Sequence, residues 1–356
     1  MDWTSTMKQS YEFYIVDPGT WKDLRPLNVV TKCKINRDSS EDTLGSASIT
    51  CTEVLDECYI RVYLIATQKL KNKNEETKKI PLGTFLVQTP SIEFDGKVST
   101  ITLDAYTPLI ELKDVKPPIG YTLQKNEKIM ENASKLCGEN TRVPVVKTSS
   151  DDKIESDFIS NLDDSWFSFI NDLIYNAKYK FGLDELGKII FEPIQDLDAL
   201  QPVWTYTDNN TSILYPDISY ERDLFEIPNA VEVVYSSSFG YRVAKAVNDS
   251  ESSPISTVNR GREVLHRETN PRFTSVPTQD QLDEYAKKLL KQVSVLQHKL
   301  TYKHGYCPVR VGDCVLFNCR AAGLSNVKAR VISQTISCET GCPVEETAVY
   351  TTKLWG

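Results

Sequence analysis

The feature that most constrains the fold is a series of short β-type segments near the N-terminus. They are rich in Val, Ile, Tyr and Thr, and turn residues such as Asp17-Pro18-Gly19 separate them. β-branched and aromatic residues favour strands, whereas Gly, Pro and Asp favour the turns between them. The predicted strands cover residues 11–16, 27–35, 47–51, 58–67, 82–88 and 97–106. About six strands in so short a segment predict a small barrel or sandwich.

A charged segment, residues 69–79, interrupts this region. It contains five Lys and two Glu and has no apolar face beyond Leu70. Such a segment is typical of a solvated hairpin tip, with a phosphate or lipid site as the alternative.

The middle of the chain has helical periodicity. Residues 127–137 predict a short helix, and residues 139–156 form a polar stretch that predicts a loop. A stronger helix is predicted for residues 166–179, capped by Asp164 or Ser165, with an aromatic-rich face suited to a core or a subunit contact. Residues 180–193 then predict a hairpin whose turn Gly187 closes.

The C-terminal part predicts strands with one inserted helix. Strands are predicted at residues 218–224, 229–235, 241–247, 315–317, 327–338 and 347–354. The inserted helix covers residues 278–298, where Thr278 and Gln281 match a capping box and the periodicity becomes alternating at His298. Gly312-Asp313 predicts a turn between strands.

These segments predict a mainly β fold with an α+β middle. The predicted domains are a first β-barrel at residues 1–115, a helical and mixed α/β middle at 116–215, and a second β-barrel at 216–356 that contains the helix and could also recruit the hairpin 180–193. A chain of 356 residues is long enough for two or three domains.

Composition narrows the class of protein. No apolar run approaches the roughly 20 residues of a membrane-spanning helix, and the N-terminus lacks the pattern of a secretion signal. Nine cysteines without a Cys-x-x-Cys pair favour reduced thiols. The net charge of -8 argues against general affinity for nucleic acid, although an acidic protein can let DNA pass.

Motifs for catalysis or metal binding are mostly absent. The sequence has no phosphate-binding glycine loop, no His-Glu-x-x-His and no Gly-x-Ser-x-Gly, and its histidines are His266, His298 and His304. His304 and Cys307, with Asp313 nearby, resemble a nucleophile and its base, but a spacing of three on a strand points the two side chains to opposite faces.

Two further groups of residues are candidate sites. Cys314, Cys319, Cys338 and Cys342 match no familiar zinc spacing, so that packed thiols are preferred to a metal site. Asp151-Asp152 and Asp163-Asp164 are typical of solvated loops or helix starts, and a glycosidase pair has no positive support. The sequence therefore predicts no catalytic, cofactor-binding or metal-binding residues.

Taken in order along the chain, several segments resemble the baseplate hub or tail-tip hub proteins of tailed bacteriophages. Each segment is a weak pattern, and the order of the segments gives the resemblance its specificity. The segments are residues 47–51, 59–63, 80–85, 103–106, the Trp166 helix, 187–191, 227–231, 281–286 and 308–315.

The resemblance implies a fold and a role. It implies two small tail-tube-like β-barrels joined by helical segments, with three chains forming a ring that links a sixfold tail tube to a threefold spike, tail tip or fibre. Such a protein would be a non-enzymatic component of the virion and would form a homotrimer. Its other partners would be a tail-tube or distal tail protein, a spike or tail-tip/fibre protein, and the tape measure protein. It would meet DNA only in transit, would bind no membrane and would be assembled in the bacterial cytoplasm.

Two other classes of function remain alternatives at this point. The chain ends at Trp355-Gly356, soon after the second β-region, so that cell-wall hydrolysis or receptor binding is expected to belong to a partner. A tail-associated cell-wall hydrolase and a receptor-binding module are therefore the alternatives to a structural hub.

Overall fold

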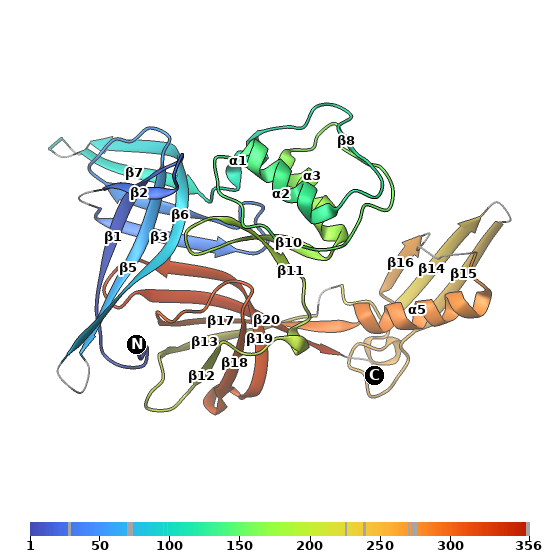
Figure 1. The fold of residues 1–356 in the computed structure, drawn as a ribbon. Helices are drawn as coiled ribbons and strands as arrows, with labels where there is room; N and C mark the ends of the chain where they lie inside the picture. Colours follow the sequence, from blue (N-terminus) through green and yellow to red (C-terminus); the bar gives the residue numbers. More distant parts are fainter. Residues whose placement is uncertain are drawn as a thin grey trace. The chain divides into compact units, whose positions relative to one another are not determined.

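The computed structural model describes residues 1–353 except 28–29, 70–73, 95, 98, 225, 238–239, 270 and 272–275 (Figure 1). Its helices are α1 (Ile110–Asp114), α2 (Ile129–Asn140), α3 (Trp166–Asn176), α4 (Thr257–Arg260) and α5 (Gln279–Val293), with 3-10 turns η1 (Leu197–Ala199) and η2 (Arg320–Ala322). The strands in the first part of the chain are β1 (Lys8–Asp17), β2 (Lys22–Pro26), β3 (Lys32–Asp38), β4 (Gly45–Cys51), β5 (Tyr59–Lys69), β6 (Glu75–Phe94), β7 (Ser99–Tyr106), β8 (Thr122–Leu123), β9 (Phe158–Ile159), β10 (Tyr179–Leu183) and β11 (Ile189–Pro193). The later strands are β12 (Trp204–Thr207), β13 (Leu214–Asp223), β14 (Ala230–Ser237), β15 (Gly240–Val247), β16 (Leu265–Thr269), β17 (Val295–Gly305), β18 (Cys314–Cys319), β19 (Leu324–Ser337) and β20 (Pro343–Lys353).

The predicted mainly β fold is confirmed. A 13-stranded sheet runs in the order β13-β17-β20-β19-β3-β4-β7-β6-β5-β1-β2, with β12 and β18 attached through β19. Strands from the two ends of the sequence meet where β19 pairs antiparallel with β3, which places Ile336 opposite Ile35. The two predicted β-regions therefore share one hydrogen-bonded sheet.

Alternating side chains explain why the first β-region forms. In β4 the inward positions hold Ala47, Ile49 and Cys51, and the residues between them are half-buried. Inward side chains of β1 and β3 to β7 form one core with Ile336 of β19 and Val344 of β20. The first β-region therefore has one continuous core, and its closure into a small barrel stays a prediction. Residues 70–73 of the predicted hairpin tip, and residues 28–29 of the predicted strand 27–35, lie outside the described residues.

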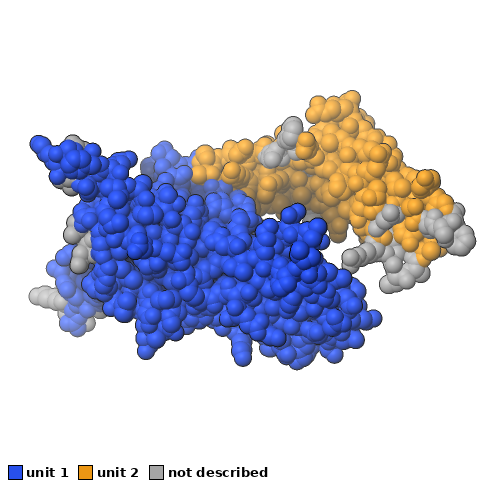
Figure 2. All heavy atoms as spheres, turned by 90° about the horizontal axis from the view of Figure 1, so that it is seen from above, with its two compact units in different colours: residues 1–218, 302–347 blue, residues 219–301, 348–356 orange. Residues whose placement is uncertain are grey.

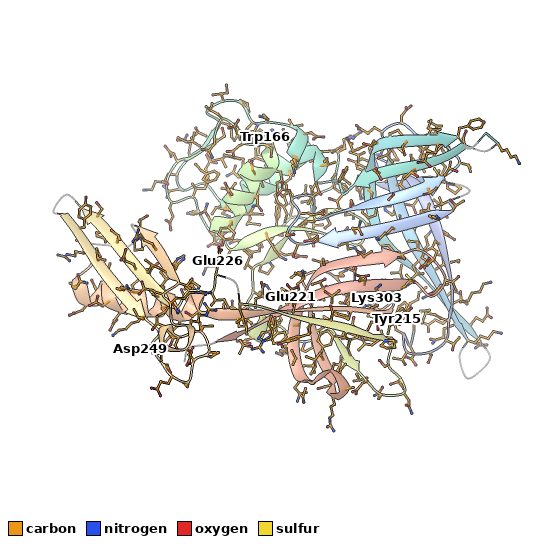
Figure 3. All side chains as sticks on the ribbon, turned by 180° about the vertical axis from the view of Figure 1, so that it is seen from behind. Trp166, Tyr215, Glu221, Glu226, Asp249 and Lys303 are labelled. Carbon is orange, nitrogen blue, oxygen red and sulfur yellow. The ribbon has the colours of Figure 1, made fainter. Side chains whose placement is uncertain are left out.

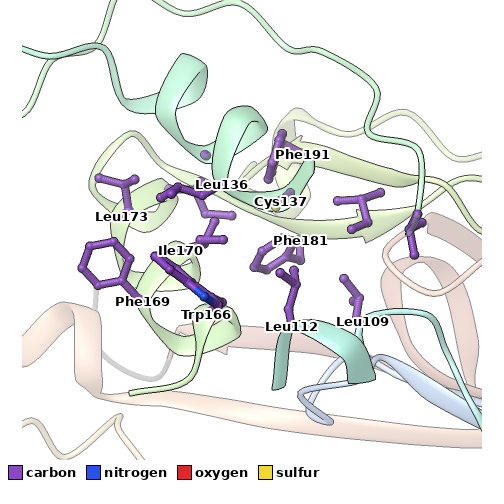
Figure 4. Packing of buried hydrophobic residues seen from close by; sticks show 14 of the residues in the cluster. Leu109, Leu112, Leu136, Cys137, Trp166, Phe169, Ile170, Leu173, Phe181 and Phe191 are labelled. Atoms are coloured by element: carbon purple, nitrogen blue, oxygen red, sulfur yellow. The ribbon is translucent and has the colours of Figure 1, made fainter. Parts of the chain in front are cut away.

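The helical middle region packs around α2 and α3. Ser165 caps α3, because its hydroxyl accepts the backbone N–H of Ser168 while the Ser168 hydroxyl accepts that of Ser165. The predicted helix 166–179 is three residues too long, since Lys178 has a positive φ of 59° and the helix ends at Asn176. Figure 4 shows the resulting core, in which aromatic and aliphatic side chains of α3 meet those of α2 and the β10–β11 hairpin. Figure 3 marks Trp166, the first residue of α3.

The predicted hairpin 180–193 is confirmed as a two-stranded sheet of β10 and β11. Gly187 in its turn has a φ of 77°, a conformation that glycine adopts without strain. Phe181, Ile189 and Phe191 lie in the helical core, and the hairpin forms a separate two-stranded sheet.

The chain divides into two compact units, which Figure 2 colours separately. Unit 1 comprises residues 1–218 and 302–347, and unit 2 comprises residues 219–301 and 348–356. This division differs from the three predicted domains 1–115, 116–215 and 216–356, which remain a proposal about modules of the sequence.

Unit 2 contains more than the predicted inserted helix. Strands β15, β14 and β16 form a separate three-stranded sheet, and Leu282, Ala286 and Leu290 of α5 pack against Val231 and Ala244 of that sheet. The periodicity of residues 229–247 correctly predicted strands but could not reveal which sheet they join.

The start of the predicted helix 278–298 is confirmed, but its end is wrong. Thr278 and Gln281 form the expected capping box. The helix ends at Val293 because Ser294 leaves helical geometry and its hydroxyl donates to the carbonyl of Pro228 at 2.8 Å. Alternate burial then begins at Leu296 in β17, so the change of period precedes His298.

Candidate functional site

His304 and Cys307 lie together, contrary to the sequence prediction. Strand β17 ends at Gly305, so Cys307 lies beyond the strand and the alternation of faces no longer applies. The Cys307 Sγ is 3.8 Å from the His304 Nδ1. Asp313 is not part of this pair, since its carboxylate accepts the backbone N–H of Arg310 at 2.8 Å in the predicted turn.

A buried carboxylate, Glu346, is the centre of the cluster around His304. Its Oε2 lies 3.3 Å from the His304 Nε2, accepts the Tyr302 hydroxyl at 2.7 Å and accepts the Tyr206 hydroxyl at 3.1 Å. Its Oε1 accepts the Gln334 Nε2 at 2.6 Å. We refer to Tyr206, Tyr302, His304, Cys307, Gln334 and Glu346 as the Glu346 network.

Strands that are distant in sequence contribute these side chains. Tyr206 comes from β12, Tyr302 and His304 from β17, Gln334 from β19 and Glu346 from β20. All six members of the network belong to unit 1. Aromatic contacts complete it, because Tyr206 stacks on Phe317 of β18 with ring centroids 5.3 Å apart.

Electrostatics favour a charged pair inside this network. Burial alone lowers the pKa of His304, but its bonds to Cys307 and Glu346 outweigh burial and raise the pKa to about 10. Burial raises the pKa of Glu346, yet hydrogen bonds from His304, Tyr302 and Gln334 hold it below the ordinary value. At neutral pH the network therefore holds an imidazolium beside a carboxylate.

The burial of the Glu346 network limits its access to a substrate. His304 and Glu346 are 0% exposed, and Cys307 is 1% exposed. A nucleophile and its base must reach a substrate, and this pair is enclosed by the sheet. The buried hydrogen bonds and ion pair of the network instead link four strands, β12, β17, β19 and β20. The absence of catalytic residues stays a prediction.

The charged pair should make the stability of unit 1 depend on pH. A folded-state pKa of about 10 for His304 means that its contribution is complete below the ordinary value near 6.5 and is lost as pH rises towards 10. We expect the free energy of unfolding to fall between pH 7 and 9, by at most about 1.4 kcal/mol per pH unit from this group. Urea unfolding across this range, compared with His304→Gln, measures the difference. Parallel pH profiles for the two proteins would contradict the assignment.

On the acid side, the contribution of Glu346 is present above about pH 4.5 and lost below it.

The other predicted groups are separate from this network. Cys314 and Cys319 lie on β18, whereas Cys338 and Cys342 lie between β19 and β20. All nine cysteines are free, and within the described residues no group of three or more His, Cys, Asp or Glu could hold a metal. The preference for packed thiols over a metal site stays a prediction.

The carboxylate pairs lie in loops and at a helix start, as the sequence suggested. Asp152 forms a hydrogen bond with Ser150. Asp164 accepts the backbone N–H of Asn161 at 2.7 Å just before α3.

Unit 1 also contains a cavity of 290 Å³. We call it the Arg37 cavity; its lining comes from the β3–β4 loop, β6, α3, the β10–β11 hairpin and the turn after Pro308. Its lining residues include Arg37, Leu44, Leu82, Phe85, Phe167, Asn171, Lys180, Phe181, Glu185, Glu192, Arg310 and Val311. No local sequence pattern predicts this cavity, because its walls come from segments hundreds of residues apart.

Arg37 connects the cavity to the Glu346 network. Its Nη1 donates to the Gln334 Oε1 at 2.7 Å, and its Nη2 donates to the carbonyl of Leu82. Gln334 in turn donates to Glu346. A sequence signal did exist for the network, since Glu346 and His304 occupy inward positions of alternating strands, where a polar side chain needs a partner.

Solved structures with similar folds include two tail proteins and a chain from a PdpA–VgrG complex. The tail protein from Neisseria meningitidis MC58 has a TM-score of 0.66 and 11% identity, and the match covers 96% of this chain and 97% of that chain. The 43 kDa tail protein of prophage MuSo2 from Shewanella oneidensis has a TM-score of 0.63 and 10% identity, over 96% of both chains. A chain of the lidded Francisella PdpA–VgrG complex has a TM-score of 0.60 and 10% identity, covering 96% of this chain and 53% of that chain.

These likenesses confirm the predicted resemblance at the level of the fold. The matches span nearly the whole of this chain and of both tail proteins, so they are not limited to a single sheet. Models of known protein families give no match, and neither do curated protein sequences. Within the described part of the chain, no helix combines the length and apolar character needed to cross a bilayer.

Proposed function

We propose that the chain is a structural, non-enzymatic protein of a bacteriophage tail, located in the virion. The observation that carries the proposal is the end-to-end match of the fold to two tail proteins. The similar chain from a PdpA–VgrG complex comes from an assembly of two different proteins, which supports a role in a larger assembly.

Within the tail we propose a trimeric hub at the distal end. Three copies would form a ring that links the tail tube or distal tail protein above to the spike, tail tip or fibre below, with the tape measure protein as a further partner. One exposed edge supports contacts between copies. Strand β6 pairs with β5 as far as Leu86. Beyond Leu86, as far as Phe94, β6 pairs only with β7 among the described strands, so its other edge is free of strand pairing.

The end of this edge is apolar and exposed. Ile92 is 58% exposed and Phe94 is 69% exposed. Strand edges with exposed apolar side chains readily pair with other chains. We therefore propose this end of β6 as a contact between copies in the ring.

The ring would surround a bore through which DNA passes without being retained. The net charge of -8 supports this part of the proposal, because an acidic surface repels phosphates. An assembled ring whose bore is lined mainly by Lys and Arg would contradict it.

Mass measurement and imaging test the hub. We expect the purified chain, mixed with its tube partner, to give particles with three copies and threefold rings in negative-stain images. Ile92→Lys with Phe94→Lys should reduce the copies per particle, whereas a charge added at exposed Leu162 should not. A chain that stays monomeric with the tube protein present would overturn the hub.

The hydrolase alternative has one observation in its favour, the contact between Cys307 and His304. Zymography on host peptidoglycan distinguishes it from the hub. Clearing by the full chain that disappears in Cys307→Ala would support the hydrolase, and no clearing is expected from the structural protein. Direct binding of the chain to host cells would support the remaining alternative, a receptor-binding module.

A further inference from the structure

Two cysteines face each other where β3 and β19, strands from the two ends of the sequence, pair. The register of this antiparallel pairing places Ser337 opposite Lys34. The next pair in the same register is Cys338 with Cys33, and the backbone N–H of Cys338 donates to the carbonyl of Cys33 at 2.9 Å. Cys33 and Cys338 are therefore directly opposed residues of one ladder.

The side chains of the two cysteines lie on the same face of the sheet. Side chains alternate between the two faces along a strand, so residues two apart share a face. Ile35 and Ile336 are opposed and fully buried, and each lies two residues from one of the cysteines. Cys33 belongs to the core that contains these isoleucines, and Cys338 packs against it. Both thiols are therefore on the core side of the sheet.

The backbone spacing of an opposed pair suits a disulfide bond. Opposed residues of an antiparallel ladder have Cα atoms about 4.5–5.5 Å apart. Disulfides join residues whose Cα atoms are about 4.4–6.8 Å apart. Both thiols are free in this structure. A bond between them therefore requires rotation of two side chains and no new approach of the strands.

The surroundings of the thiols assign each of them a part in the reaction. A hydrogen bond with the Cys33 thiol, together with burial, raises the pKa of the Cys338 thiol. Cys338 is partly exposed just beyond the end of β19, whereas Cys33 is buried. Cys338 is thus the thiol that a reagent reaches, and Cys33 is the thiol beside it.

A third cysteine, Cys342, lies in the same region but has a different partner. Burial raises the pKa of the Cys342 thiol to about 12, although a hydrogen bond with the Tyr11 hydroxyl lowers it. Tyr11 is fixed in turn, because its hydroxyl donates to the carbonyl of Glu339 at 2.7 Å. Cys33, rather than Cys342, is therefore the partner expected for Cys338.

We propose that Cys33 and Cys338 form a disulfide, by exchange with a small-molecule disulfide, when the chain leaves a reducing environment. The Cys338 thiolate attacks one sulfur of the small disulfide and releases one small thiolate. The Cys33 thiolate then attacks the Cys338 sulfur in the mixed disulfide and releases the second small thiolate. The two protons lost by the cysteines are taken up by the two released thiolates, so the small disulfide is reduced as the protein disulfide forms.

The bond would join two segments of unit 1 that are hundreds of residues apart in sequence. Closing so long a loop restricts the unfolded chain and so favours the folded state. The inference is independent of the proposed tail role, since both cysteines belong to one chain and one unit.

Peptide mapping of the oxidised chain tests the pairing. The reduced full chain is treated with oxidised glutathione at mildly alkaline pH, where more thiolate is present, and the remaining thiols are blocked with iodoacetamide. Trypsin with a glutamate-specific protease, used without reduction, isolates Cys33 in residues 33–34 and Cys338 in residues 331–339. The second protease also separates Cys338 from Cys342. We expect these two peptides to be linked, with loss of two hydrogen atoms. Absence of the link, or a bond from Cys338 to Cys342, would overturn the proposal.

Single variants identify the two partners. In Cys33→Ser, Cys338 should stop at the mixed disulfide with glutathione, and in Cys338→Ser the link should disappear. Cys58→Ser is the matched control, because Cys58 is also partly exposed but precedes β5, away from this pair of strands. The link should form in Cys58→Ser as it does in the original chain. A link from Cys338 to another cysteine in Cys33→Ser would contradict the assignment.

Unfolding in urea shows whether the folded sheet accommodates the bond. The oxidised chain should have a higher midpoint than the reduced chain, and Cys338→Ser should have the same midpoint before and after treatment with glutathione. A midpoint that does not rise in the linked chain would contradict a bond formed without strain between opposed residues.

Discussion

Glu346→Ala is expected to destabilise unit 1 by about 3–5 kcal/mol, because removing one partner of a buried pair leaves an uncompensated charge. The His304 imidazolium would lose the carboxylate 3.3 Å away. The hydroxyl of Tyr302 and the amide of Gln334 would lose the oxygens that accept their hydrogen bonds. Each unsatisfied buried donor adds to the loss.

The preceding residue provides a matched control. Glu345 lies next to Glu346 in β20, but its side chain is exposed and pairs with Lys303 on the surface at 3.1 Å. Glu345→Ala should change the free energy of unfolding by no more than about 1 kcal/mol, because exposed ion pairs contribute little. Hydrogen exchange of unit 1 amides measures both variants separately from unit 2. Similar losses of protection in the two variants would show that the network does not hold the sheet together.

The sequence correctly predicted those helices and hairpins that a short local motif marks. The capping box at Thr278 and Gln281 was found because its residues stand three apart at the start of an amphipathic run. The β10–β11 hairpin was found because Gly187 lies between two short apolar strands. Elements without such a signal were missed, among them β2, whose residues are exposed along its whole length.

The candidate sites could not be found in this way, since they depend on pairings between distant strands. The network joins Tyr206 to Glu346, and β12 reaches it through a parallel pairing with β18. The expectation that His304 and Cys307 point apart was wrong because it assumed that the strand continues to Cys307. Strand β17 ends two residues earlier, at Gly305. The end of a strand depends on tertiary contacts that a local sequence pattern does not reveal.

The strongest effect in the helical middle is expected for Trp166→Ala. Trp166 is buried at the start of α3 (Figure 4). It packs edge-to-face on Tyr121 with ring centroids 5.0 Å apart. Its ring also contacts Phe169 in the same core. Removing a buried tryptophan typically destabilises a domain by about 3–5 kcal/mol, through lost burial and the cavity left behind.

Tyr175 on the same helix is the matched control, because its side chain is aromatic but 67% exposed. Tyr175→Ala should change stability by no more than about 0.5 kcal/mol. Hydrogen exchange of α2, α3 and the β10–β11 hairpin measures the effect, because all three contribute to one core. We expect Trp166→Ala to lower protection in all three elements together. Loss confined to the first turn of α3 would mean that the aromatic core does not couple the hairpin to the helices.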